Sequence, residues 1–134
     1  MDALIAHTLL DRETLVEIVS AVQETSPQIV LAGPPGTSKT WIADAIARYI
    51  AGTESKVRLV QFHPNYSYES FVQGLRPVAE DGGISFKLQR GALLELVKDM
   101  GEEAEKQKGN AGLYVMVIDE MNSMLRSAEC SLEV

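Results

Sequence analysis

The sequence contains a single cysteine, Cys130, which excludes an internal disulfide. One thiol fits a reducing compartment, and Cys130 is expected to serve as a small hydrophobic side chain. No apolar stretch approaches the ~20 residues that a membrane span requires, and the start, Met1-Asp2-Ala3, lacks the basic segment that opens a signal peptide. These absences predict a cytoplasmic protein that does not bind a membrane.

Positive charge is also scarce, with 12 Lys and Arg residues against 19 Asp and Glu residues and a net charge of −7. Such a chain repels the phosphate backbone of nucleic acids, so no direct DNA binding is expected from it. A hydrophobic content of 46% with 23% charged residues is ordinary for a globular protein. The length of 134 residues allows one domain at most.

The most informative stretch covers residues 33–40 and reads Gly-Pro-Pro-Gly-Thr-Ser-Lys-Thr. An apolar run at residues 28–32 precedes it and predicts a strand, and an amphipathic run from Trp41 predicts a helix. This order is typical of a phosphate-binding P-loop, the Walker A motif, whose backbone N–H groups curl around an anion at a helix N-terminus. The strict motif has glycine at the position of Ser38, and the small serine is expected to preserve the turn.

The residue types in this loop predict their roles at a site for a nucleoside triphosphate. Lys39 is expected to reach the β- and γ-phosphates and to act in catalysis, and the Thr40 hydroxyl is expected to bind Mg²⁺. The residues predicted to bind the nucleotide are Gly33, Pro34, Pro35, Gly36, Thr37, Ser38, Lys39, Thr40 and Trp41. The choice between GTP and ATP stays open, because no base-selective motif is visible.

A second motif lies at residues 113–120, where a continuous apolar run ends in Asp119 and Glu120. Such a run predicts a strand of a parallel sheet, buried on both faces. Ligands of open α/β sheets bind at the carboxyl ends of the strands, where these two acids are expected. Asp119 is predicted to hold Mg²⁺, and Glu120 to orient or deprotonate the attacking water, as in a Walker B motif.

Periodicity and turn signals predict the remaining elements. These are helices at residues 8–25, 40–51, 67–74, from 91 and from 121, a strand at 57–62, and a hairpin at about 75–90. The apolar stripe of the helix after Gly91 is expected to consist of Leu93, Val97, Met100 and Ala104. The aromatic segment His63–Phe71 has two open interpretations, which are packing of its own loop and contact with a partner or substrate.

Three segments together resemble the McrB branch of the AAA+ ATPases. They are the loop at 33–40, residues Val117–Asn122, and residues 61–77, which read Gln-Phe-His-Pro-Asn-Tyr-Ser-Tyr-Glu-Ser-Phe-Val-Gln-Gly-Leu-Arg-Pro. The run at 61–77 distinguishes this branch from other P-loop NTPases, because the Walker motifs alone occur in very many proteins. The resemblance implies an α/β fold, namely an AAA+ P-loop NTPase core with a parallel sheet flanked by helices and a β-hairpin insert. It also implies a GTPase or ATPase that forms a homo-oligomeric ring with complete subunits and works with a McrC-like nuclease subunit.

Departures from the family pattern predict an incomplete domain over residues 1–134. Family members continue Asp-Glu-Ile-Asn-Arg, whereas this chain has Met121, Asn122 and Ser123. The sensor-1 strand, the arginine finger and the helical lid have no counterpart here, and the family strand order 5-1-4-3-2 places the missing strand beside the P-loop strand. The chain is therefore expected to be marginal alone or to pair its strands in an adapted sheet, with slow hydrolysis. The alternative is a catalytically impaired module that binds nucleotide and docks onto full-length subunits.

Overall fold

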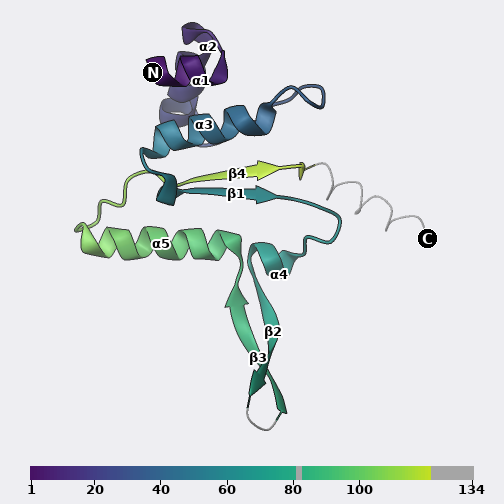
Figure 1. Cartoon of the computed structure of the whole chain (residues 1–134). Helices are drawn as coiled ribbons and strands as arrows, with labels where there is room; N and C mark the ends of the chain where they lie inside the picture. Colours follow the sequence, from purple (N-terminus) through teal and green to yellow (C-terminus); the bar gives the residue numbers. More distant parts are fainter. Residues whose placement is uncertain (81–82, 122–134) are drawn as a thin grey trace. The chain divides into compact units, whose positions relative to one another are not determined.

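The computed structural model describes residues 1–80 and 83–121 of the chain (Figure 1). Helices and strands both occur, and the α/β fold class predicted from the sequence is confirmed. The chain divides into two compact units, which are Met1–Leu59 with Val115–Val117, and Val60–Tyr114 with the described residues from Ile118. Each unit is described by itself. None of the described helices has the length and apolar character needed to cross a membrane.

The first unit begins with two short helices where one long helix was predicted. These are α1 (Asp2–Thr8) and α2 (Arg12–Ser20), and a π-helical turn, η1 (Ala21–Thr25), continues α2. The break arises because Leu9 adopts a left-handed conformation with φ 59° and because Asp11 caps α2. The Asp11 carboxylate accepts a hydrogen bond from the Thr14 N–H at 2.8 Å, a typical N-cap contact. The helix α1 was not predicted.

The core of this unit forms where α1 and α2 meet α3 (Lys39–Ala51). Its buried residues are Leu4, Leu15, Ala45 and Ile46. Leu15 is fully buried and Val19 nearly so. The helix α3 ends at Gly52, whose φ of 75° is the left-handed conformation common at helix ends. A short 3₁₀ turn, η2 (Glu54–Lys56), follows.

The predicted strand at residues 28–32 is wrong, because this segment has no strand structure. Ile29 is 41% exposed and Val30 is 86% exposed. A strand requires a neighbouring ladder for its N–H and C=O groups, and within the described residues the only partner strands are those named below. The apolar run therefore leads into the loop at 33–40 without joining a sheet.

The strands β1 (Val57–Gln61) and β4 (Val115–Asp119) pair with each other and point in the same direction (Figure 1). The Phe62 N–H extends the pairing by donating to the Asp119 carbonyl at 2.9 Å. Both strands were predicted within two residues of their observed ends. The expected burial on both faces is wrong, because in β4 only Val117 is buried and its neighbours are half-buried. A strand with one partner keeps more of its surface exposed than a central strand does.

The second unit contains α4 (Tyr68–Phe71), β2 (Gln73–Glu80), β3 (Gly83–Arg90) and α5 (Ala92–Lys106). The predicted helix at 67–74 is shorter than expected because β2 begins at Gln73. Ser67 caps its start, since the Ser67 side chain accepts a hydrogen bond from the Ser70 N–H. The predicted hairpin is confirmed, with β2 and β3 antiparallel from the pair Gln73–Arg90 onward.

The base of the hairpin is held tightly against α4. The Gly91 N–H donates to the Val72 carbonyl at 2.6 Å. A Cβ atom on Gly91 would lie only 2.5 Å from the carbonyl carbon of Phe71, so no other residue fits there without a shift of the backbone. The hairpin therefore leaves α4 in a fixed direction.

The apolar stripe predicted for α5 is partly wrong. Leu96 is the buried residue of this helix, whereas Val97 is 46% exposed and Met100 is 40% exposed. The end of α5 is fixed by Tyr114, whose hydroxyl donates to the Glu103 carboxylate at 2.6 Å. This hydrogen bond, with smaller contributions from desolvation and charge, raises the pKa of Tyr114 to about 12. The helix predicted from residue 121, like Cys130, lies outside the described residues.

Candidate nucleotide-binding site

The loop at residues 33–38 forms a compact turn that leads directly into α3. Gly36 has φ 79°, a left-handed conformation that glycine adopts without strain. The Thr37 hydroxyl donates to the Pro34 carbonyl at 2.9 Å and closes the turn. The sequence therefore folds locally into a tight turn directly before α3, although the preceding strand is not formed.

Lys39, the first residue of α3, folds its side chain back over this loop. Its Nζ atom donates to the Pro34 carbonyl at 2.6 Å and lies 3.4 Å from the Thr37 hydroxyl oxygen. A lysine that reaches across the loop from a helix N-terminus places its positive charge at the centre of the turn. The helix dipole adds positive potential at the same place. The structure thus brings Lys39, Pro34 and Thr37 together.

Ser38 adopts a conformation that usually belongs to glycine. Its φ of 58° and ψ of 25° are left-handed, and its side chain makes no capping hydrogen bond to α3. A Cβ atom in this region costs roughly 1–2 kcal/mol. The strict motif has glycine at this position, and the structure shows the physical reason.

Replacing Ser38 with glycine is therefore expected to raise the free energy of unfolding by about 0.5–1 kcal/mol, since relief of backbone strain outweighs the greater freedom of the unfolded chain. Urea denaturation followed by circular dichroism measures this change. Ser20→Gly is the matched control, because Ser20 has helical angles of φ −63° and ψ −40° and the change should destabilise the protein. Equal destabilisation by both variants would contradict the strain at Ser38.

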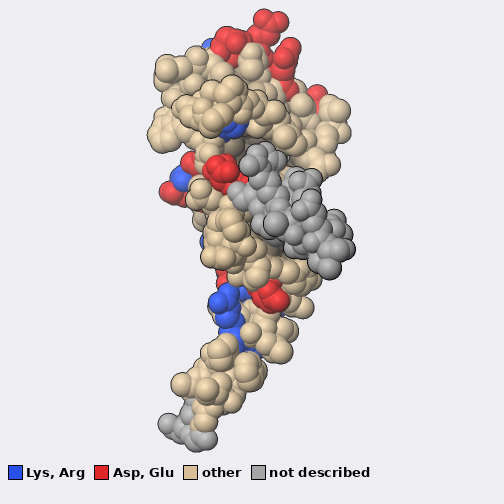
Figure 2. Space-filling view, turned by 90° about the vertical axis from the view of Figure 1, so that its right-hand side faces the viewer, with Lys and Arg blue, Asp and Glu red and all other residues tan. Residues whose placement is uncertain are grey.

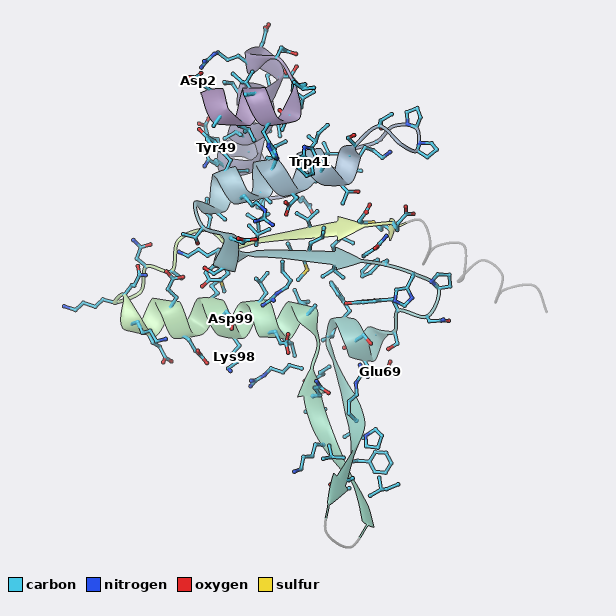
Figure 3. The ribbon with its side chains drawn as sticks, viewed as in Figure 1. Asp2, Trp41, Tyr49, Glu69, Lys98 and Asp99 are labelled. Carbon is cyan, nitrogen blue, oxygen red and sulfur yellow. The ribbon has the colours of Figure 1, made fainter. Side chains whose placement is uncertain are left out.

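Trp41 lies in the first turn of α3 and its ring is stacked on that of His7 in α1. The ring centroids are 4.4 Å apart, and the indole N–H lies 3.5 Å from the His7 carbonyl oxygen. Trp41 nevertheless remains 55% exposed, close to the start of α3 (Figure 3). Sequence reasoning missed His7, because 34 residues separate it from Trp41 and only tertiary packing joins them.

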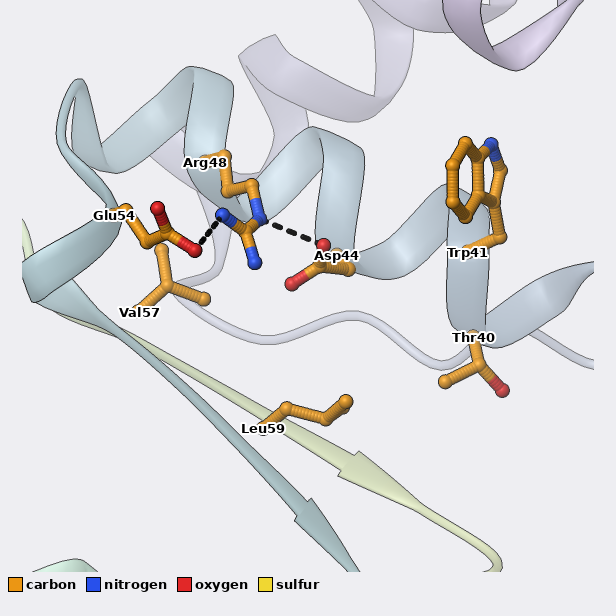
Figure 4. Close-up of a pocket in the computed structure, with 7 residues that line it drawn as sticks. All are labelled: Thr40, Trp41, Asp44, Arg48, Glu54, Val57 and Leu59. Atoms are coloured by element: carbon orange, nitrogen blue, oxygen red, sulfur yellow. Dashed lines mark hydrogen bonds and ion pairs between the residues drawn. The ribbon is translucent and has the colours of Figure 1, made fainter.

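A hollow of about 420 Å³ lies beside α3 (Figure 4). Its lining residues are Thr40, Trp41, Asp44, Arg48, Glu54, Val57 and Leu59. Arg48 contacts Asp44 at 2.7 Å and Glu54 at 2.5 Å. The hydrogen bond to Asp44, and then that to Glu54, raises the pKa of Arg48. These two carboxylates balance the positive charge of Arg48.

The second predicted motif ends in two acids with different environments. Asp119 is half-buried at the end of β4, and its Oδ1 accepts the Glu120 N–H at 2.9 Å. Glu120 is exposed and has φ 55°. The Asp119 carboxylate and the Thr40 hydroxyl are oxygen donors of the type that Mg²⁺ prefers. They belong to different units, and the described part of the chain contains no cluster of three or more His, Cys, Asp or Glu residues arranged for a metal.

Left-handed backbone at non-glycine residues is concentrated at these motifs. The described residues with positive φ other than glycine are Leu9, Ser38, Lys108 and Glu120. Leu9 and Lys108 follow the ends of helices, where this conformation is common. Ser38 and Glu120 do not follow the end of a helix, and each lies in one of the two predicted motifs. Backbone strain of this kind is typical of functional sites.

The aromatic segment after β1 packs against itself. The ring of Phe62 lies 5.1 Å from Tyr66 and 5.4 Å from Phe71, and His63 lies 5.6 Å from Tyr66. Tilted and edge-to-face pairs at these distances stabilise a loop. Of the two interpretations of this segment, the contacts favour packing, while Tyr68 is 65% exposed and lies outside the cluster.

Comparison with known proteins places these features in a family. The profile of the AAA domain, dynein-related subfamily, matches residues 28–132. The chain therefore belongs to this family of AAA+ P-loop NTPases. It is also 35% identical over 112 residues to the type IV methyl-directed restriction enzyme EcoKMcrB subunit of Escherichia coli (strain K12). The match covers 82% of this chain and 22% of that relative, and it identifies the chain as a McrB-like AAA+ module.

Proposed function

We propose that this chain binds GTP or ATP with Mg²⁺ through the loop at 33–40 and supports slow hydrolysis, as part of a McrB-like AAA+ domain. The observation that carries this proposal is the turn at Pro34–Thr37, over which Lys39 places its ammonium group at 2.6 Å from the Pro34 carbonyl. A phosphate that enters the turn offers Lys39 an anionic acceptor in place of a neutral carbonyl, which gives a stronger hydrogen bond.

Each proposed residue has a defined role at this site. The backbone of 33–40 cradles the phosphates, and Lys39 neutralises charge on the β- and γ-phosphates. Thr40 and Asp119 would hold Mg²⁺, which would supply positive charge against the charge that develops on the phosphates during phosphoryl transfer. Glu120 orients or deprotonates the attacking water. The exposed face of Trp41 stacks on the nucleotide base, and His7 fixes the orientation of the indole.

The proposal extends to the assembly by way of the relative, whose printed name describes a subunit of a methyl-directed restriction enzyme. We propose that residues 1–134 form part of an AAA+ domain that joins a homo-oligomeric ring with complete subunits in the cytoplasm. A McrC-like nuclease subunit is the proposed partner of that ring. The net charge of −7 supports a role in which DNA is contacted by other parts of the assembly.

A second candidate function is that of a catalytically impaired module that binds nucleotide and docks onto full-length subunits. The apolar segment at 28–32 favours it, because this segment is outside any sheet and Val30 is 86% exposed. Unpaired extended backbone with apolar side chains is a template for pairing with another chain. In this role the chain would lower the turnover of complete subunits.

Measurement of phosphate release separates the two candidates. With GTP or ATP, the hydrolytic role predicts release that depends on Mg²⁺ and stops when EDTA is added. The rate is expected to be about 10³–10⁵ below that of a complete site, because removal of an arginine finger has this effect. Addition of the chain to the full-length Escherichia coli relative tests the docking role, which predicts reduced turnover. Absence of both effects would overturn the proposal.

A further inference from the structure

The hydroxyl group of Thr37 contacts both of the other groups that meet at the turn before α3. It donates to the Pro34 carbonyl at 2.9 Å. A hydroxyl has one proton to donate and lone pairs that accept, so the same group can also accept a hydrogen bond from a cation. The Lys39 ammonium lies 3.4 Å from the Thr37 oxygen and donates to the Pro34 carbonyl at 2.6 Å. Lys39 Nζ, Thr37 Oγ1 and the Pro34 carbonyl oxygen therefore form a triangle of mutual contacts.

The stem of Lys39 reaches this triangle along the backbone of Gly33. A Cβ atom on Gly33 would lie 3.8 Å from the Lys39 Cδ atom and 3.7 Å from the Thr37 hydroxyl oxygen, which are ordinary contact distances. Lys39 is the first residue of α3, and its side chain turns back from there over the loop. The helix thus fixes the base of the lysine, and the triangle fixes its charged tip.

Both oxygen atoms that accept hydrogen bonds from Lys39 in the triangle are neutral. Pro34 offers a carbonyl and Thr37 a hydroxyl, so an anionic phosphate oxygen is a stronger acceptor than either. Figure 2 shows acidic side chains gathered at the end of the first unit that α1 and α2 form, where Asp2 pairs with Arg12. The triangle therefore holds the positive charge of Lys39 over the turn without neutralising it.

The Thr37 hydroxyl also determines what happens to the turn when Lys39 meets a phosphate. An ammonium group has three N–H donors, and the two contacts of the triangle leave one of them for a phosphate oxygen. If Lys39 releases the Pro34 carbonyl as well, that carbonyl keeps the Thr37 hydroxyl as its donor. The turn then stays closed in either case. Without the hydroxyl, Lys39 would have to close the turn and bind the phosphate at the same time.

We propose that Thr37 is a positioning residue, whose hydroxyl holds the Lys39 ammonium over the turn and keeps the turn closed when Lys39 binds phosphate. The inference deepens the proposed function and rests on it for the identity of the ligand, a nucleoside triphosphate. The placement of the ammonium in the free chain is independent of any ligand. Loss of the hydroxyl is expected to weaken this placement about 3- to 10-fold, the effect of one hydrogen bond.

Acetylation of lysines in the free chain tests the placement of the ammonium. Acetic anhydride reacts with amines that are released from hydrogen bonds, and mass spectrometry of peptides gives the rate at Lys39 relative to Lys98 in the same sample. Thr37→Val keeps the shape of threonine without its hydroxyl and should raise the relative rate at Lys39 about 3- to 10-fold. Thr37→Ser retains the hydroxyl and should react at the parent rate.

Thr53→Val is the matched control for Thr37→Val. Thr53 is an exposed threonine outside both motifs, and its hydroxyl lies 3.4 Å from that of Ser55. This variant should leave the acetylation of Lys39 unchanged. Thr37 is exposed as well, so circular dichroism should show the helix content of the parent chain in all of these variants.

Titration of the same variants with fluorescent GTP and ATP analogues and Mg²⁺ completes the test. Thr37→Val should raise the Kd about 3- to 10-fold, and Thr37→Ser should restore the parent value. Equal acetylation of Lys39 in the parent and Thr37→Val chains, a Thr37→Ser variant that behaves like Thr37→Val, or an unchanged Kd of Thr37→Val would each overturn the positioning role. A parent chain that binds no nucleotide, but whose Lys39 is still protected by Thr37, would overturn the proposed function and leave the placement of the ammonium intact.

Discussion

Replacing Lys39 with alanine is expected to weaken the binding of GTP or ATP with Mg²⁺ by at least about 100-fold. The Lys39 ammonium group lies over the turn at Pro34–Thr37, where the phosphates are proposed to bind. Fluorescence titration with labelled nucleotide analogues measures the change in Kd.

Lys98→Ala is the matched control for Lys39→Ala, because it removes a surface lysine of α5 whose ammonium group pairs with Glu102 at 3.2 Å. Circular dichroism should show that both variants keep the helix content of the parent chain. Equal affinity of the Lys39→Ala variant and the parent chain would contradict the assignment of the phosphate site to this loop.

Replacing Glu120 with glutamine is expected to lower Mg²⁺-dependent hydrolysis by about 10²–10⁴-fold and to leave nucleotide affinity unchanged. Glutamine has the shape of glutamate but cannot accept a proton from water. Phosphate release in a single turnover, with enzyme in excess over nucleotide, measures the chemical step directly. The affinity is measured separately by titration.

Glu105→Gln serves as the control for Glu120→Gln, because Glu105 is an exposed acid on α5 outside both motifs. This control should hydrolyse nucleotide at the parent rate. If Glu120→Gln lowers affinity and rate equally, Glu120 acts in binding and not in activation of water.

Local sequence signals predicted the elements that local interactions determine. The helix α3, the strands β1 and β4 and the hairpin were all predicted close to their observed bounds. Asp11 and Ser67 are of residue types that favour helix N-caps, and both accept the backbone N–H groups of a capped first turn. Capping, turn chemistry and hydrophobic periodicity all act over a few residues, so a single sequence contains them.

The errors arose where distant parts of the chain decide the outcome. The run at 28–32 has the composition of a buried strand, but a strand needs a neighbouring ladder, which no local pattern records. The stripe on α5 was placed one residue away from the buried position, Leu96, because periodicity does not state which face meets the rest of the unit. The helix break at Leu9 depends on one left-handed residue that is not a glycine.

At the candidate site too, the sequence indicated the features that depend on local motifs and missed those that depend on tertiary contacts. The loop residues, Asp119 and Glu120 were predicted from motifs, because their spacing along the chain is itself the signal. His7 was missed, since it meets Trp41 only after α1 folds against α3. The left-handed conformation of Ser38 was not predicted either, although the departure from glycine at that position pointed to it.

Titration of the chain with fluorescent GTP and ATP analogues in the presence of Mg²⁺ tests the central claim most directly. The proposed phosphate site predicts saturable binding, one nucleotide per chain, that unlabelled GTP or ATP displaces and that EDTA weakens. The base that binds more tightly then identifies the natural nucleotide. A soluble chain with its helices formed that shows no saturable binding of either analogue would contradict the claim that the loop at 33–40 is a working nucleotide site.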